Sequence, residues 1–394
     1  MWKCVIKSTA RWAFGWNLDR KLWSLVKEKR AEGGSKMVVA EQVKQKSPKE
    51  FFLNLSPGKL TGLRNVSDQE GRLKVLALDQ SNSFKKFLRA LYEKQGNKRE
   101  PTYKDIMDAK LEITEILSPL STAVLLDVNY GARQCLNSGA LAHQVGLIIR
   151  LEASKDPGIA GIVEPGWSVK QIKKMGGTAV KLLVYMDVED KSATEGQMKF
   201  VRQMSADCAD QDILLMTEEL SYPQKNEDKD SPAYVARKPG NINMSAELIG
   251  PFTDILKLEY PANIKTDDEK TQIKNLETLN QKAIRPWVLL SAGVKFDIFL
   301  KQVELAMKAG ASGTMAGRAI FQEYFDYTNR EDQKKFLKTT GLDRMKKIAE
   351  LVDKYATPWQ KRYETNTAEM LSAVEADWYS KGAVASGAGV SGEY

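Results

Sequence analysis

Residues 74–79 read Lys-Val-Leu-Ala-Leu-Asp, a short apolar run that ends in a carboxylate, and runs of this kind decide the fold. Apolar runs of this length, bounded by polar residues, predict buried strands. Seven more follow along the chain, at 123–127 (AVLLD), 146–152 (GLIIRLE), 179–185 (AVKLLVY), 213–218 (ILLMTE), 255–259 (ILKLE), 287–291 (WVLLS) and 313–316 (GTMA). The sequence therefore predicts eight strands.

The segments between these runs carry helical patterns. Residues 106–117 place apolar side chains on one face and stop before Pro119, and residues 299–306 do the same before Gly310. Eight alternating strand and helix units over about 260 residues match an α/β fold, the (β/α)8 TIM barrel. A doubly wound sheet is the competing architecture. It needs a glycine-rich first turn, whereas residues 79–82 read Asp-Gln-Ser-Asn.

The rest of the chain is organised around this barrel, which we expect over residues 73–330. A polar, helical lead-in is expected over 37–72 and C-terminal helices over 331–380. The Gly/Ala/Ser-rich stretch 381–394 predicts a disordered tail. Residues 226–241 are polar and contain two prolines, which predicts a long loop after the fifth strand.

The first 36 residues differ in composition from the remainder. They hold nine Lys and Arg against three Asp and Glu, a net charge of +6 out of +8, and four of the eight tryptophans. The other 358 residues therefore carry only +2, so the barrel itself has no basic excess that would predict a nucleic-acid partner. We expect this leader to lie outside the fold, either as a targeting-like segment or as sequence upstream of a start at Met37.

Composition excludes several classes of protein. One histidine, His143, cannot build a three-histidine zinc site, which makes metal-dependent hydrolysis and aldol chemistry poor hypotheses. Three scattered cysteines without a C-x-x-C pair indicate a reducing compartment, and we expect a cytoplasmic protein. No apolar run approaches the 20 or so residues of a membrane span. We expect no metal, no cofactor and no membrane partner, and the sequence leaves the oligomeric state open, homo-oligomers included.

Charged and polar residues interrupt or end the predicted strands, and barrel enzymes carry their reactive groups at the carboxyl ends of strands. The residues in such positions are Asp79, Asp127, Glu152, Glu218, Ser291, Lys181 and Lys257. Lys257 and Lys181 each lie inside an apolar run, where desolvation and mutual repulsion would lower the pKa of an amine and free it as a nucleophile. A single such lysine usually reaches solvent or pairs with a carboxylate. Two of them on alternate strands favour a Schiff-base site.

Acidic residues would assist such a site. Glu218 is the candidate for proton transfer beside an imine. The alternative is that Glu218 or Glu219 begins a solvated loop. Asp79 would hold a lysine or a substrate hydroxyl, or would cap the following helix.

Two small-residue turns occupy the place where barrels commonly bind phosphate. Ser291 and Gly293 follow the seventh strand, and Gly317 and Arg318 follow the eighth. Small residues let backbone N–H groups approach an anion, and an arginine adds a bidentate contact. These four residues are therefore the predicted phosphate site.

Taken together, the motifs resemble those of the tagatose 1,6-bisphosphate aldolase family, class I enzymes of the (β/α)8 type. The resemblance runs from about residue 74 to 359 and rests on these stretches: LALDQ at 76–80, LLD at 125–127, WSVK at 167–170, AVK at 179–181, LKLE at 256–259, LSAGV at 290–294 and AGRA at 316–319. It implies an imine on Lys257, an active-site lysine at Lys181, substrate contacts from Asp79 and Gln80, and phosphate binding at the two turns.

The chain also departs from the family pattern. The family commonly continues Asp-Gln with Arg-Gly, where this chain has Ser81-Asn82, and its Glu-Pro-Leu becomes Glu218-Glu219-Leu220. The leading hypothesis is a class I aldolase that cleaves D-tagatose 1,6-bisphosphate to dihydroxyacetone phosphate and glyceraldehyde 3-phosphate. One alternative is an aldolase for a sulfonated or other phosphorylated ketose, since a cation near the substrate is missing. Another is a non-catalytic regulator that binds a sugar phosphate.

Overall fold

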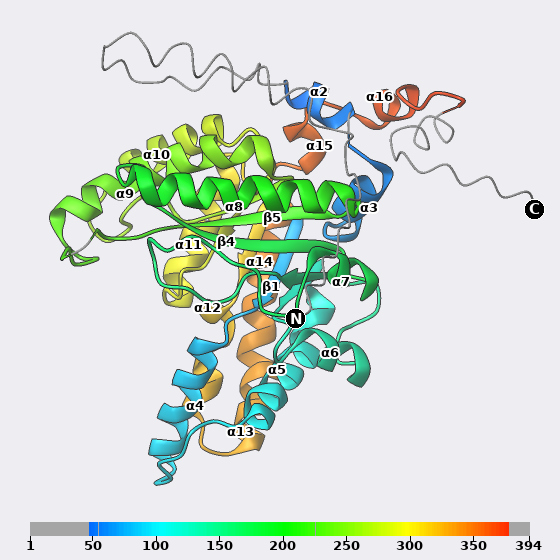
Figure 1. The fold of residues 1–394 in the computed structure, drawn as a ribbon. Helices are drawn as coiled ribbons and strands as arrows, with labels where there is room; N and C mark the ends of the chain where they lie inside the picture. Colours follow the sequence, from blue (N-terminus) through cyan, green and yellow to red (C-terminus); the bar gives the residue numbers. More distant parts are fainter. Residues whose placement is uncertain (1–46, 54, 225, 378–394) are drawn as a thin grey trace, which may run out of the picture. The chain divides into compact units, whose positions relative to one another are not determined.

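The computed structural model describes residues 47–53, 55–224 and 226–377. The expectations for the leader at 1–36 and the tail at 381–394 concern residues outside these ranges. The described part contains the predicted barrel together with helices before and after it (Figure 1).

Eight parallel strands close into a barrel in sequence order, with β8 paired to β1 (Figure 1). The strands are β1 (Leu73–Leu78), β2 (Ala123–Leu126), β3 (Gly146–Arg150), β4 (Ala179–Met186), β5 (Leu214–Ser221), β6 (Ile255–Leu258), β7 (Trp287–Leu290) and β8 (Gly313–Ala316). Each coincides with one predicted run to within three residues at either end. The prediction of a (β/α)8 barrel is confirmed.

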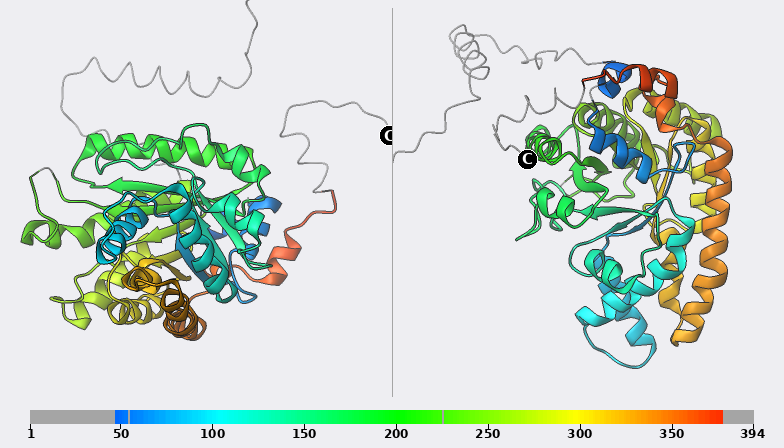
Figure 2. Two further views of the ribbon diagram at one scale, coloured as in Figure 1. Left: turned by 90° about the horizontal axis from the view of Figure 1, so that it is seen from below. Right: turned by 90° about the vertical axis from the view of Figure 1, so that its right-hand side faces the viewer.

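Helices surround the sheet on its outer face (Figure 2). Between the strands lie α4 (Asn82–Lys94), α5 (Tyr103–Leu117), α6 (Ala132–Ser138), α7 (Val169–Lys174), α8 (Lys191–Asp210), α9 (Pro232–Ile249), α10 (Glu269–Lys282) and α11 (Phe296–Lys308). After β8 follow α12 (Arg318–Phe321), α13 (Arg330–Phe336), α14 (Leu342–Tyr355), α15 (Trp359–Arg362) and α16 (Thr367–Ser372). A π-helical turn, Leu337–Gly341, joins α13 to α14.

The predicted loop over 226–241 is wrong in its second half, because α9 begins at Pro232. Ser231 caps this helix by accepting a hydrogen bond from the backbone N–H of Tyr234, and proline fits the first helical position. Pro239 lies inside the helix despite its missing N–H. Burial of the apolar residues that follow, such as Ile242, outweighs that local penalty.

The amino-terminal end of the barrel is closed by α2 (Pro48–Leu53), α3 (Pro57–Asn65) and α15. The chain after α3 touches the starts of the strands, since the Thr122 hydroxyl donates to the carbonyl of Val66. Trp359 is 2% exposed and packs with Phe52 and Tyr363 in the same apolar cluster as the barrel interior. The carboxyl-terminal mouth lies at the opposite end of the barrel.

Within the described ranges, no helix combines the length and apolarity that a bilayer span requires. In the same ranges, no group of three or more His, Cys, Asp or Glu side chains is arranged to hold a metal ion.

Candidate active site

The inward-facing positions of the strands change from apolar to charged toward the mouth. Side chains alternate along a strand, so Met216 and Glu218 of β5 share the interior face, as do Ile255 and Lys257 of β6. Glu218 stands directly beside Lys257 in the register of β5 and β6. The carboxyl ends of the strands thus carry a layer of charged side chains above an apolar base.

Glu218 bridges the two lysines predicted from the sequence. Its Oε1 lies 2.8 Å from Lys257 Nζ, and its Oε2 lies 2.7 Å from Lys181 Nζ. Lys257 and Lys181 are 3% and 1% exposed, so this contact is shielded from solvent. Both candidate lysines and the candidate proton-transfer group therefore meet in one cluster.

Lys181 also contacts Asp79 Oδ2 at 3.0 Å and Glu152 Oε1 at 2.9 Å. Burial favours the neutral amine, but three carboxylates outweigh it and raise the pKa of Lys181 well above its ordinary value. The expectation that the pKa of both lysines is lowered is therefore wrong for Lys181, which remains an ammonium. Among the described residues, Lys257 has one carboxylate, Glu218, within ion-pair distance.

The carboxylates of the cluster differ in their affinity for protons. Burial acts to raise the pKa of Glu218, but Lys181 and Lys257 lower it below the ordinary value. The pKa of Asp79 is likewise lowered, because Lys181, Lys257 and Arg150 outweigh its burial. Burial prevails at Glu152, whose pKa is raised. Glu218 and Asp79 are therefore ionised at neutral pH, and each can accept a proton.

Glu219 points the opposite way from Glu218 on β5, toward the surrounding helices. It is fully buried, and neither carboxylate oxygen has a hydrogen-bond partner among the described residues. Burial, with Glu259 as the next cause, raises the pKa of Glu219 well above its ordinary value. The alternative that a solvated loop begins at these glutamates is wrong, because β5 continues to Ser221.

Asp79 follows β1 and connects the cluster to the adjacent loop. Its Oδ1 accepts a hydrogen bond from Gln80 Nε2 at 3.0 Å, and its carboxylate contacts Lys181 rather than capping α4. Gln80 Oε1 is buried without a partner among the described residues. Gln80 therefore retains an acceptor near the cluster for a ligand donor.

The two predicted phosphate turns lie against each other at the ends of β7 and β8. The backbone N–H of Gly317 donates to Ser291 Oγ at 3.4 Å. Gly293 has φ +77°, and a Cβ there would lie 2.9 Å from Arg318 Cζ; a Cβ on Gly317 would lie 2.6 Å from the carbonyl oxygen of Ala77. Glycine is required at both positions, and the guanidinium of Arg318 lies against the Gly293 turn.

A groove of about 550 Å³ extends from Arg318 across the loops after β5, β6 and β7. Tyr185, Tyr222 and Lys238 line its far part. Arg318 thus lines a groove at the mouth of the barrel.

The model of the DeoC/LacD family of aldolases matches residues 75–323. The chain belongs to the DeoC/LacD aldolase family. The family resemblance drawn from the sequence motifs is confirmed, and the match spans every strand from Val75 of β1 to β8.

This DeoC/LacD family member is similar to curated proteins along most of their length. It is 29% identical over 339 residues to the tagatose 1,6-diphosphate aldolase of Listeria monocytogenes serotype 4a (strain HCC23), which covers 79% of this chain and 96% of that one. It is 28% identical to the tagatose 1,6-diphosphate aldolase of Staphylococcus aureus (strain MSSA476), in an alignment that covers 79% of this chain and all of that one.

Two solved fructose-bisphosphate aldolases share the fold. The enzyme of Plasmodium falciparum has a TM-score of 0.54 at 11% identity, covering 75% of this chain and 94% of that chain. The enzyme of Slackia heliotrinireducens DSM 20476 has a TM-score of 0.52 at 15% identity, covering 79% of this chain and 94% of that chain.

Sequence reasoning missed two basic residues of the charged layer. Lys110 of α5 is fully buried and reaches Asp127 Oδ1 and the carbonyl of Leu78, both at 2.6 Å. Arg150 ends β3 and is 7% exposed. The sequence did indicate Arg150, because this residue interrupts the apolar run 146–152 in the same way as Lys181 interrupts the run 179–185. No sequence pattern indicated Lys110, because it lies on a helix among other charged residues.

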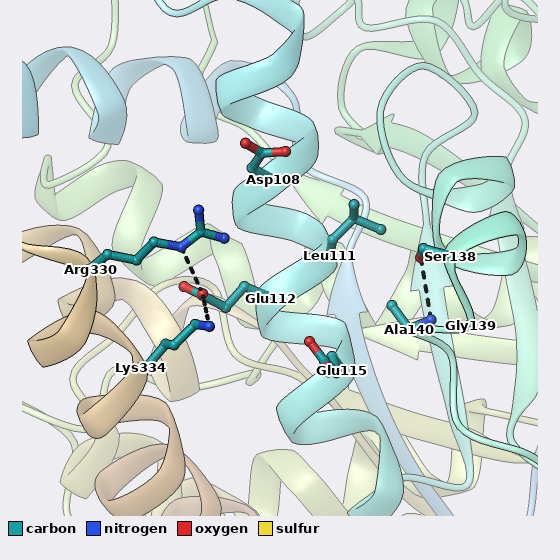
Figure 3. Close-up of a pocket in the computed structure, with 9 residues that line it drawn as sticks. All are labelled: Asp108, Leu111, Glu112, Glu115, Ser138, Gly139, Ala140, Arg330 and Lys334. Carbon is teal, nitrogen blue, oxygen red and sulfur yellow. Dashed lines mark hydrogen bonds and ion pairs between the residues drawn. The ribbon is translucent and has the colours of Figure 1, made fainter.

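A separate pocket of about 260 Å³ lies outside the barrel between α5, α6 and α13 (Figure 3). Glu112 at its wall is paired with Arg330 Nε at 3.2 Å and Lys334 Nζ at 3.5 Å, and accepts a hydrogen bond from Tyr324. None of the predicted site residues lines it. Two cations compensate the charge of Glu112, and the pocket is not part of the candidate active site.

Proposed function

We propose that the protein is a class I aldolase that cleaves a phosphorylated ketohexose through an imine on Lys257. The observation that carries this proposal is the shielded 2.8 Å contact between Lys257 Nζ and Glu218 Oε1 at the mouth of the barrel. A nucleophilic amine beside a carboxylate is the arrangement that imine chemistry needs. Relatives at 28–29% identity are named for tagatose 1,6-diphosphate, so D-tagatose 1,6-bisphosphate is the proposed substrate.

In the first half of the proposed reaction, Glu218 accepts a proton from Lys257, and the neutral amine attacks the C2 carbonyl. Glu218 returns this proton to the carbinolamine hydroxyl, which leaves as water, and a protonated imine remains. Glu218 is again a carboxylate at this point, as its lowered pKa favours.

In the second half, Glu218 takes the proton of the C4 hydroxyl. The C3–C4 bond breaks, its electron pair moves to the imine nitrogen, and glyceraldehyde 3-phosphate leaves. The resulting enamine is protonated at C3 by Glu218, which restores the protonated imine. Water hydrolyses this imine and releases dihydroxyacetone phosphate and the Lys257 ammonium with which the cycle began. A single carboxylate thus carries the proton through both halves.

The other residues would orient and stabilise these groups. Lys181 remains an ammonium 2.7 Å from Glu218, so it favours the carboxylate form. It would also stabilise the oxygen that leaves as water. Asp79 and Gln80 would contact substrate hydroxyls. Ser291, Gly293, Gly317 and Arg318 would hold the phosphate on C1.

A second substrate is favoured by one observation. Ser81 stands where the family commonly has an arginine, which changes the charge near the substrate. An aldolase for a ketose phosphate that ends in a sulfonate is therefore the alternative. Cleavage rates of the purified protein on the two substrates would distinguish them.

Trapping with borohydride tests the mechanism directly. Reduction in the presence of dihydroxyacetone phosphate should add one reduced adduct, and peptide mapping should place it on Lys257. Lys257→Met should abolish the adduct, whereas Lys301→Met, at a half-exposed lysine of α11, should not. An adduct on another lysine, or no adduct in the wild-type protein, would contradict the proposal.

A further inference from the structure

Arg150 is a buried cation to which the proposed reaction gives no role. It is the last residue of β3, stands beside Lys181 in the strand register and shares the interior face with Ile148. It is 7% exposed. Desolvating a guanidinium is costly unless hydrogen bonds and an opposite charge compensate it.

The contacts of Arg150 supply hydrogen bonds but no close counterion. Nη1 donates to the carbonyl of Asp79 at 2.7 Å and to Ser81 Oγ at 3.4 Å, and Nη2 donates to Asn129 Oδ1 at 2.9 Å. These three acceptors are neutral. Among the described residues, the one carboxylate oxygen within 4.0 Å is Glu164 Oε2, at 4.0 Å.

The geometry around Arg150 differs from that of Lys181, which touches three carboxylates. Arg150 Nε is buried and has no hydrogen-bond partner among the described residues. A guanidinium that is held in place by neutral acceptors and retains an unused donor fits an anion supplied by a ligand.

The position of Arg150 fits the far end of the substrate. In a closed barrel of eight strands, β3 lies opposite β7, whose turn belongs to the predicted C1 phosphate site. Asn129 and Ser81, which contact Arg150, lie in the loops after β2 and β1. An extended ketohexose with its C1 phosphate near Arg318 and its C2 at Lys257 would direct its C6 group toward this side.

The sequence adds an independent reason. Ser81 occupies the position where the family commonly has an arginine, and its hydroxyl is in contact with the Arg150 guanidinium. Residue 81 in the loop after β1 thus carries no cation, and the guanidinium of Arg150 reaches this residue from β3.

We propose that Arg150 binds the anionic group on C6 of the substrate, a phosphate or a sulfonate, and thereby selects ketoses that carry an anion at both ends. This inference rests on the proposed aldolase function and specifies which substrates that site accepts.

The test compares cleavage of three substrates, D-tagatose 1,6-bisphosphate, D-tagatose 1-phosphate and a 6-deoxy-6-sulfo-ketohexose 1-phosphate. The variants are Arg150→Gln and Arg150→Lys, with Arg64→Gln as the matched control, because Arg64 is an exposed arginine of α3 at the other end of the barrel. Arg150→Gln should lower kcat/KM for the C6-anionic substrate about ten- to a hundredfold, mainly through KM, because a charge-assisted contact is lost. The change on D-tagatose 1-phosphate should be less than about threefold.

Arg150→Lys keeps the charge without the planar fork and should give an intermediate loss. If Arg150→Gln does not fold, Arg150→Lys serves as the test. The ratio of its kcat/KM for D-tagatose 1,6-bisphosphate to that for D-tagatose 1-phosphate should then be lower than in the wild-type protein. Of the C6-phosphate and C6-sulfonate substrates, the one whose kcat/KM falls more in the Arg150 variants carries the natural C6 group. An equal loss on substrates with and without the C6 anion would overturn the proposal.

Borohydride trapping with dihydroxyacetone phosphate separates this result from the proposed function. That ligand has no C6 group, so Arg150→Gln should be trapped as efficiently as the wild-type protein. Failure of trapping in the wild-type protein refutes the imine mechanism, whereas normal trapping with an unchanged substrate ratio refutes only the role of Arg150.

Discussion

Lys181 holds together three carboxylates that would otherwise repel one another. Its replacement by methionine leaves Asp79, Glu152 and Glu218 buried without their shared cation. We expect Lys181→Met to lower the free energy of unfolding by about 3–5 kcal/mol, as for a buried ion pair that loses one partner. Denaturant unfolding measures this change.

A surface ion pair provides the control for that prediction. Lys282 pairs with Glu247 at 2.8 Å, but both side chains are more than 40% exposed, so Lys282→Met should cost at most about 1 kcal/mol. Adding Asp79→Asn to Lys181→Met should restore part of the stability, because it removes a buried carboxylate that Lys181 keeps ionised in the wild-type protein. Equal effects of the two lysine substitutions would contradict this account of Lys181.

Single residues of the site differ in how far their sequence context predicts them. Lys257 and Glu218 interrupt or end apolar runs, which made them candidates, but the pattern also allowed a lysine that reaches solvent and a loop at Glu218, and the structure shows that both are buried. The charge state of Lys181 does not follow from the pattern, because it depends on which carboxylates from β1, β3 and β5 reach it. Such contacts across the barrel depend on strand register and side-chain rotamers, which the sequence of a single strand does not predict.

At the scale of the element, β5 presents two adjacent glutamates to opposite sides. Glu219 faces the helices, and its raised pKa keeps the proton on the folded protein at pH values where the unfolded chain, with a pKa of about 4.3, has lost it. Since the folded state then binds more protons, this residue lowers stability progressively as pH rises above about 4. Glu219→Gln imitates the protonated acid and removes that dependence.

We therefore expect Glu219→Gln to match the wild-type stability near pH 4 and to exceed it by on the order of 1–2 kcal/mol at pH 8. Thermal unfolding across this pH range measures the difference. Glu277→Gln, at an exposed position of α10, is the control and should show no such trend. A constant difference between Glu219→Gln and the wild-type protein at all pH values would argue against a buried, protonated Glu219.

Element boundaries were predictable where periodicity was strong. The eight strands and helices such as α5 and α11 follow from apolar patterns that their burial requires. The start of α9 was missed because prolines and charges at 226–241 are typical of loops. The cap at Ser231 and the buried residues that begin at Tyr234 decide its structure instead, and only the packed helix reveals their combined effect.

In the whole molecule, an apolar cluster and the charged cluster lie at opposite ends of the barrel. Trp359 closes the amino-terminal end, where its Nε1 donates to Ser67 Oγ at 3.2 Å and its ring packs at 6.1 Å from that of Phe52. Lys257 lies at the opposite mouth. A substitution at Trp359 should therefore weaken the fold without altering the geometry of the charged cluster.

We expect Trp359→Ala to lower the free energy of unfolding by about 3–5 kcal/mol, since it removes a large buried side chain and leaves a cavity. Folded protein should still be trapped by borohydride with dihydroxyacetone phosphate to the same extent, and should show an unchanged KM. Leu371→Ala, at a side chain that is 74% exposed, is the control for stability and should have little effect. Denaturant unfolding and trapping on the same samples test both halves of the expectation. A loss of trapping in fully folded Trp359→Ala would mean that the two ends of the barrel are not independent.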